Sequence, residues 1–462
     1  MDQTAASEPV SYRNIIRITY PIILSMFSIN IMVFIDRAFV ARYDTTQFAA
    51  VMPASNVATS LASIFLGVVG FSSTLISHHY GAGDRKSSSR TLWQGIYISL
   101  LSTLGLLAIS PLVAQIFSLM GHGGELLAYE KQFFYLMILS NSVQIMIAAC
   151  SSLFRGVGDT KKILYVSVIA NLCNILLDWL LIFGNWGFPE LGGIKGAGLA
   201  TLFSCLLNLL LTVLLLCTPA YKKGFEVFKH WKPDLAPFKK IWKFGLPSGI
   251  QSFVGTAYFS LLLLILGGTG ENDLTAANIV FTIEGLSIFP IWGLGNALSI
   301  VAAQERGGGR TDNISGVLRK GLWLALGFNV LIIAVFNLLP GPLISIFHDP
   351  SSPGYQAVLD ITIPLVRLTS VWIIFDSVQI VIGSILKAAG DTLFMMKLYL
   401  LMPIVFYLVL PYLTYTVAGY SLYWVWLELL AFTLAMLLFV GKRYLDGKWR
   451  QIEVLKPPSV SA

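Results

Sequence analysis

Charged side chains are scarce in this chain of 462 residues. Asp, Glu, Lys and Arg together make up 12% of it, whereas hydrophobic residues make up 56% and the mean hydropathy is +0.74. A soluble domain carries about 25% charged residues, so this shortage excludes the ordinary soluble class. The composition instead predicts a polytopic membrane protein built only of α-helices.

Cysteine is rare, and the common nucleotide-binding and catalytic motifs are missing. The four cysteines, Cys150, Cys173, Cys205 and Cys217, fall in predicted helices without paired spacing, which favours neither disulfides nor a zinc site. No Gly-Lys-Ser/Thr loop is present, which disfavours direct use of ATP. No buried His–Asp or Cys–His pattern indicates catalysis, so we expect neither an enzyme nor a cofactor.

Long hydrophobic segments dominate the chain. Each predicted span is long enough to cross a hydrocarbon core of about 30 Å, which needs about 20 apolar residues. We expect twelve spans at residues 15–39, 46–79, 90–117, 128–155, 161–184, 194–218, 240–267, 274–304, 316–347, 358–388, 394–414 and 420–441.

The basic residues report how these spans are oriented. With the N-terminus in the cytoplasm, all but five of the 31 Lys and Arg fall on the inside; the exceptions are Arg37, Arg42, Lys131, Lys195 and Arg367. This asymmetry predicts that both termini are cytoplasmic. We also expect the protein to lie in the inner membrane of a bacterium. The net charge of +7 therefore indicates topology and contact with anionic lipids, not nucleic acid.

The two halves of the chain repeat each other. Gly81 and Gly83 recur 226 residues later as Gly307 and Gly309, and LFRGVGDT at 153–160 resembles ILKAAGDT 232 residues later. The pattern predicts two pseudo-symmetric six-helix lobes related by an axis along the membrane normal. We place them at residues 1–219 and 241–462, joined by a cytoplasmic amphipathic linker at 220–240. The apolar side chains of this linker should lie among lipid headgroups: Phe225, Phe228, Trp231, Leu235 and Phe238.

Two acids lie inside predicted spans of the first half. Asp36 ends the apolar run 22–35, and Asp178 follows Asn174 by four residues, so these last two share a helix face. A carboxylate at membrane depth costs about 3 kcal/mol, which favours a role in ion binding over interhelical glue. Thr201 can add a hydroxyl, and Pro21 should weaken its helix and act as a hinge.

The second half carries its own acids in different places. Asp376 and Gln379 share a helix face, and Glu284 lies in another predicted span. These three residues are candidates for a substrate site or a secondary cation site, although an ion pair with Arg367 can equally explain Glu284. Leu262 stands at the position that matches Asp36, so the two halves are chemically unequal.

Several motifs together resemble the multidrug and toxic compound extrusion (MATE) family. They are Pro21 with MVFIDRAFVAR at 32–42, HYGAG at 79–83, LFRGVGDT at 153–160, NILLD at 174–178, GLP at 245–247 and LKAAGDT at 386–392. The resemblance covers about residues 12–445. It implies twelve helices in two lobes that form a V-shaped cleft, and export of organic cations in exchange for Na+ or H+.

The resemblance also implies roles for single residues. Asp36, Asn174, Asp178 and Thr201 match the cation site of the family's amino-terminal lobe. Asp376 matches an acid of the carboxy-terminal site in the NorM-type branch. That branch has Glu eight residues after the Gly-Leu-Pro proline, where this chain has Gly255, so coupling through the amino-terminal lobe is favoured.

The sequence therefore predicts a secondary active antiporter that exports organic cations or drugs by alternating access. The coupling ion stays open, because the oxygens of Asp36, Asn174 and Asp178 suit Na+ as well as H+. We expect a monomer whose partners are small organic cations and membrane lipids. The alternative is a flippase for lipid-linked saccharides or other lipids, which would need a basic cleft for pyrophosphate.

Overall fold

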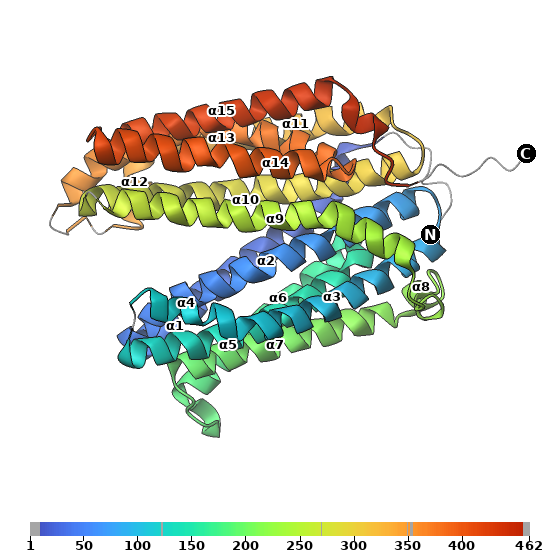
Figure 1. Cartoon of the computed structure of the whole chain (residues 1–462), viewed down its shortest axis with the longest axis horizontal. Coiled ribbons are helices and arrows are strands. Elements are labelled where there is room, and N and C mark those ends of the chain that lie inside the picture. Colours follow the sequence, from blue (N-terminus) through green and yellow to red (C-terminus); the bar gives the residue numbers. More distant parts are fainter. Residues whose placement is uncertain (1–9, 122, 269, 349, 352–353, 456–462) are drawn as a thin grey trace, which may run out of the picture. The chain divides into compact units, whose positions relative to one another are not determined.

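The chain folds into helices throughout its described part. The structure is a computed structural model that describes residues 10–121, 123–268, 270–348, 350–351 and 354–455. Within these residues, twelve helical segments are long and apolar enough to cross a membrane (Figure 1). This confirms the predicted all-helical class and the number of spans.

The first half contributes six of these segments. Short helices connect or follow them: η2 (Asn185–Gly187), α8 (Pro219–Lys222) and η3 (Val227–Lys229). The spanning helices are α1 (Tyr12–Tyr43), α2 (Thr45–Gly81), α3 (Arg85–Val113) with its continuation α4 (Gln115–Leu119), α5 (Gly124–Gly156), α6 (Thr160–Phe183) and α7 (Gly193–Leu216).

The second half contributes the other six. They are α9 (Leu235–Gly267), α10 (Glu271–Gly307), α11 (Asn313–Leu338), α13 (Tyr355–Ala388), α14 (Thr392–Pro403) with η4 (Ile404–Val409) and η5 (Tyr412–Val417), and α15 (Leu422–Leu445). The short helices α12 (Pro340–Ser345) and η6 (Lys448–Gln451) complete this half. Both η4 and η5 are π-helical and begin directly after a proline, Pro403 or Pro411. Proline lacks the backbone N–H of a regular turn, which favours such a local change of helix type.

Two compact units result. One, called here unit A, consists of residues 17–253 and 303–309; the other, unit B, consists of residues 10–16, 254–302 and 310–455. Helices α1, α9 and α10 therefore contribute to both units. The predicted division into lobes at residues 219 and 241 stays a prediction.

Close helix packing in unit A depends on glycine. A Cβ atom built on Gly67 of α2 would lie 2.3 Å from Cα of Gly249 in α9, and one on Gly245 would lie 2.7 Å from Cα of Val68. Only a residue without a side chain permits this approach of two backbones. The first half of α9 is thereby held against α2.

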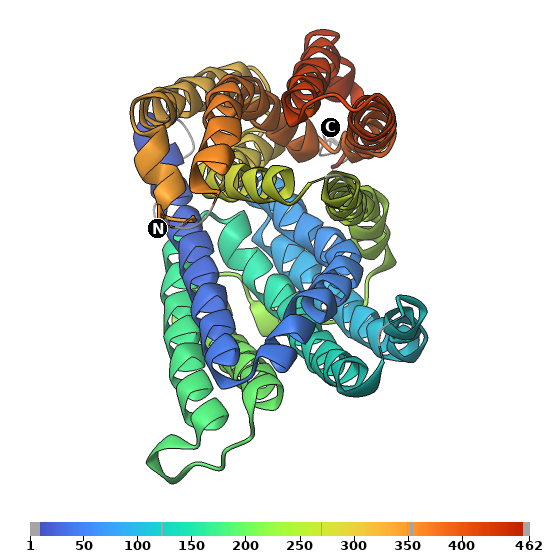
Figure 2. The same cartoon turned by 90° about the vertical axis from the view of Figure 1, so that its left-hand side faces the viewer.

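Helix α1 runs beside α6 in the same unit (Figure 2). Thr160 donates from its hydroxyl to the carbonyl oxygen of Ile18 at 3.0 Å. Further along, the amide of Asn171 donates to the hydroxyl of Ser28 at 2.8 Å. These two contacts align the faces of α1 and α6 that carry the acids predicted to bind ions.

Unit B is built around α13, which packs against α11 and α15. Its core is rich in aromatic rings, and the indole nitrogen of Trp426 donates to the hydroxyl of Thr369 at 3.0 Å. At the end of α15, Arg443 makes a two-pronged contact with Asp391, from Nε at 2.6 Å and from Nη2 at 3.1 Å. This contact ties α15 to the start of α14.

The segment between α7 and α9 differs in part from the prediction. Phe225 does not face the lipid headgroups, because it is buried with Phe154, Leu92 and Tyr221 in a core cluster of unit A. Phe228 and Trp231 are exposed, as expected of interfacial aromatics. The alternation of polar and apolar residues concealed that one side of this segment packs on the protein.

Candidate functional site

The two acids of the first half meet in unit A. Asp36 lies on α1 and Asp178 on α6, close enough for the charge of Asp36 to act on Asp178. Asp178 is fully buried, and Oδ1 of each carboxyl group is buried without a hydrogen-bond partner among the described residues. Buried polar atoms are normally paired, so these two oxygens fit a site that takes up a proton or a cation.

Asn174 joins this pair as its spacing predicts. With its side-chain amide oriented to satisfy both neighbours, Asn174 donates to Oδ2 of Asp178 at 3.1 Å. Its amide oxygen then accepts the backbone N–H of Thr201 at 3.3 Å. One amide thus bridges α6 and α7, and it leaves the other carboxylate oxygen of Asp178 free for an ion.

Thr201 contributes differently from what we expected. Its hydroxyl donates to the carbonyl oxygen of Ala197 at 2.9 Å, within its own helix. Its link to Asn174 is made by the backbone, not by the side chain. The hydroxyl oxygen retains its lone pairs and can still accept a hydrogen bond.

Pro21 lies within α1, which continues on both sides of it. The carbonyl of Pro21 accepts the hydroxyl of Ser25 at 2.8 Å, and the carbonyl of Met26 accepts the amide of Asn30 at 2.8 Å. Side chains of α1 therefore bond to backbone carbonyl groups that a bend at Pro21 would release from the helix. The role of Pro21 as a hinge stays a prediction.

Unit B gathers the acids of the second half in an aromatic environment. Glu284 on α10 is hydrogen-bonded to the side chain of Trp372, and its charge interacts with that of Asp376 on α13. Arg367, which the sequence offered as an ion-pair partner of Glu284, is exposed. The glutamate is therefore placed with Trp372 and Asp376.

Gln379 joins this group through a tyrosine. It donates from Nε2 to the hydroxyl of Tyr399 at 2.9 Å, whereas its Oε1 is buried without a partner among the described residues. Tyr399 also lies within range of the charge of Asp376. The cluster thus extends from α13 to α14.

Sequence reasoning missed the two tyrosines of this cluster. Tyr407, in the π-helical stretch η4, lies within range of both Asp376 and Glu284. The sequence feature that could have pointed to Tyr407 is the pair Pro403 and Pro411, which indicates an irregular helix. Such irregularities are frequent at functional sites.

A metal centre of the usual kind is not formed by the described residues. Among them, no group of three or more His, Cys, Asp and Glu side chains is placed to hold a metal ion. A sodium site at Asp36, Asn174 and Asp178 would contain only two acids and one amide. It would therefore not count as a group of this kind.

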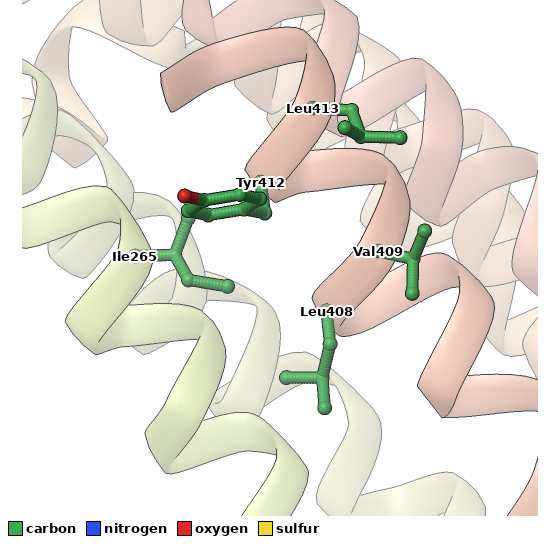
Figure 3. A pocket seen from close by; sticks show the side chains of 5 residues that line it. All are labelled: Ile265, Leu408, Val409, Tyr412 and Leu413. Atoms are coloured by element: carbon green, nitrogen blue, oxygen red, sulfur yellow. The ribbon is translucent and has the colours of Figure 1, made fainter. Parts of the chain in front are cut away.

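An apolar groove in unit B offers no chemistry for charge recognition. It has a volume of about 380 Å³ and is lined by Ile265, Leu408, Val409, Tyr412 and Leu413 (Figure 3). The side chains come from α9 and from η4–η5, and the Tyr412 hydroxyl is the only polar group on them (Figure 3). The acid clusters are therefore the better candidates for a functional site.

Comparison with known proteins gives the family. The sequence model of the MatE family matches residues 21–180 and 247–413. A probable multidrug resistance protein NorM of Thermotoga maritima is 28% identical over 365 residues, which cover 78% of this chain and 76% of that protein. A probable NorM of Rhizobium meliloti is 25% identical over 397 residues, or 84% of each chain.

The fold agrees with this match. A solved structure of a multidrug resistance MATE family transporter of the MOP superfamily, in an outward-facing conformation, superimposes with a TM-score of 0.84. The sequences are 18% identical, and the match covers 95% of this chain and 96% of that one. The chain therefore belongs to the MATE family, whose members are multi-pass membrane transporters and not enzymes.

Proposed function

We propose that the chain is a secondary active antiporter that exports organic cations or drugs in exchange for H+ or Na+. The observation that carries this proposal is the meeting of Asp36 and Asp178 in unit A, each with a buried carboxylate oxygen that lacks a partner. Two such acids inside a membrane are costly unless an ion or a proton is bound between them.

Coupling follows from the charge at this pair. Uptake of one H+ or Na+ cancels one of the two negative charges of Asp36 and Asp178, whereas loss of the ion leaves two like charges close together. Without the ion, the transporter favours a conformation in which the two acids are separated or hydrated. With the ion bound, it favours a conformation in which they are buried. Alternating access then results from the different affinities of the two states, and a bend of α1 at Pro21 would move Asp36 between them.

The cluster of unit B supplies the substrate site in this proposal. Asp376 and Glu284 provide negative charge, Gln379 an unpaired amide oxygen, and Trp372 and Tyr407 aromatic rings. An organic cation is recognised by such a combination of carboxylates and ring faces. A secondary cation at these acids is the remaining role for the same residues.

The basic residues support the proposed orientation of the transporter in its membrane. We place it as a monomer in the inner membrane of a bacterium, with both termini in the cytoplasm. Membrane lipids then surround the spanning helices.

Reconstituted vesicles test the function and identify the ion. We expect efflux of an ethidium-like dye to follow either an imposed pH gradient or an imposed Na+ gradient, and Asp36→Asn to abolish that dependence. Asp360→Asn is the matched control, because Asp360 is an exposed acid that accepts the amide of Gln356. Full gradient-driven efflux by Asp36→Asn contradicts the proposal, and transport of a lipid-linked saccharide without a gradient would favour a flippase.

A further inference from the structure

The segment between α7 and α9 is a fixed strap and not a free linker. We define the strap as residues 218–234. One face of α3 donates hydrogen bonds from four side chains to its backbone. The contacts are Ser89 Oγ to Phe225 O (2.6 Å), Trp93 Nε1 to Val227 O (2.7 Å), Gln94 Nε2 to Lys232 O (3.2 Å) and Tyr97 OH to Trp231 O.

The inner side of the strap is packed on unit A. Tyr221, Phe225 and Val227 are buried, and the hydroxyl of Tyr221 donates to Oδ2 of Asp159 at 2.6 Å. Burial and this hydrogen bond raise the pKa of Tyr221, so its phenol stays protonated and keeps donating. The outer side of the strap is therefore held in a defined position.

The outer side combines aromatic rings with positive charge. Phe228 is 41% exposed and Trp231 is 53% exposed, although both belong to a segment whose backbone is tied down. Around them, Lys222, Lys223 and Lys232 are exposed.

The negative charges of the strap are already engaged. Glu226 pairs with Lys229 at 2.6 Å, a hydrogen bond that lowers the pKa of Glu226. Asp234 accepts the backbone N–H of Ala236 at 2.9 Å. Residues 218–234 contain four lysines and two acids, so a net positive charge remains, and Lys222, Lys223 and Lys232 can attract a negative partner.

The position of the strap identifies that partner. Its ends continue directly into α7, which ends at Leu216, and α9, which begins at Leu235, and both helices are candidate spans. The strap therefore lies where the chain leaves the bilayer. Exposed Trp and Phe are typical of headgroup depth, and clustered lysines beside them bind anionic lipids.

We propose that the outer side of the strap is a docking surface for the headgroups of anionic phospholipids. The lysines contact the lipid phosphate groups, and Phe228 and Trp231 insert between the headgroups. The assignment to the cytoplasmic leaflet rests on the proposed topology, whereas the lipid binding itself does not depend on the proposed transport.

Lipid titration of the purified full-length chain in detergent tests this proposal. Phosphatidylglycerol should raise the unfolding temperature, whereas phosphatidylcholine and inorganic phosphate should not. In the triple variant Lys222→Gln, Lys223→Gln, Lys232→Gln, the apparent affinity for phosphatidylglycerol should fall about a hundredfold, since three lysine contributions are lost.

A matched triple variant controls for the change in net charge. Arg42→Gln, Lys131→Gln, Lys195→Gln removes three positive charges on the side predicted to lie opposite, and should keep the wild-type response. Without added lipid, the strap variant should unfold at the wild-type temperature, because its three lysines are exposed.

Three outcomes overturn the proposal. They are an unchanged response of the strap variant, an equal loss in both triple variants, and an equal effect of phosphatidylcholine. Trp231→Ala provides a second measurement, since it should weaken phosphatidylglycerol binding severalfold without any change in charge. An undiminished affinity in this variant would exclude the aromatic part of the surface.

Discussion

The acids inside the two units differ in what surrounds them. In unit A, Asp36 and Asp178 meet an amide, Asn174, and each keeps one oxygen without a partner. In unit B, Glu284 is hydrogen-bonded to Trp372, and Tyr407 lies within range of the charges of Glu284 and Asp376. The first environment offers oxygen atoms, whereas the second offers ring faces and hydroxyl donors.

This difference supports the unequal tasks that we propose for the two halves of the chain. A small ion needs several hard oxygens at close range, which the pair in unit A supplies. A larger organic cation gains from aromatic faces with a carboxylate nearby, which unit B supplies. The position that matches Asp36 in the second half is Leu262, buried in the core of unit B. The two halves therefore share the arrangement of helices but not the acid at this position.

The largest expected effect concerns the pair in unit A. Asp36→Asn and Asp178→Asn should each reduce gradient-driven dye efflux about a hundredfold, equivalent to about 3 kcal/mol of coupling. The double variant should be no worse than either single variant, because the two acids act as one unit. Efflux rates from reconstituted vesicles provide the measurement, and additive losses would show two independent sites.

A smaller effect is expected in unit B, and of a different kind. Glu284→Gln should raise the KM for a monovalent organic cation about tenfold by removing one negative charge near the rings. The choice between H+ and Na+ should not change. A change of coupling ion in this variant would place ion binding in unit B and remove the distinction between the units.

The smallest effect tests the aromatic part of that environment. Tyr407→Phe removes one hydroxyl near Glu284 and Asp376. It should raise the substrate KM about threefold, because a threefold change corresponds to the free energy of one weak hydrogen bond. Tyr412→Phe is the matched control, since Tyr412 is 53% exposed at the apolar groove. Equal KM values for the two variants would contradict a role of Tyr407 in the site.

Some residues of these candidate sites could be predicted from the sequence. The spacing of Asn174 and Asp178 by four residues predicted a shared face, and the structure places the amide of one on the carboxylate of the other. Tyr407 could not be found in this way, because it lies on another helix and its orientation depends on a π-helical stretch. The buried side of the strap was hidden for the same reason, since the partners of Phe225 are far from it in sequence.

Hydropathy and the positions of basic residues set the class, the twelve spans and the expected orientation, because the cost of exposing polar groups to hydrocarbon acts on each segment separately. The repeated motifs revealed the doubling for a similar reason, as each copy forms its own turn. Which acids meet was decided by packing. Asp36 faces Asp178 because α1 and α6 are joined by side-chain contacts, and Glu284 faces Asp376 because α10 and α13 lie together in unit B. Such encounters depend on the shapes of many side chains at once, which no local pattern encodes.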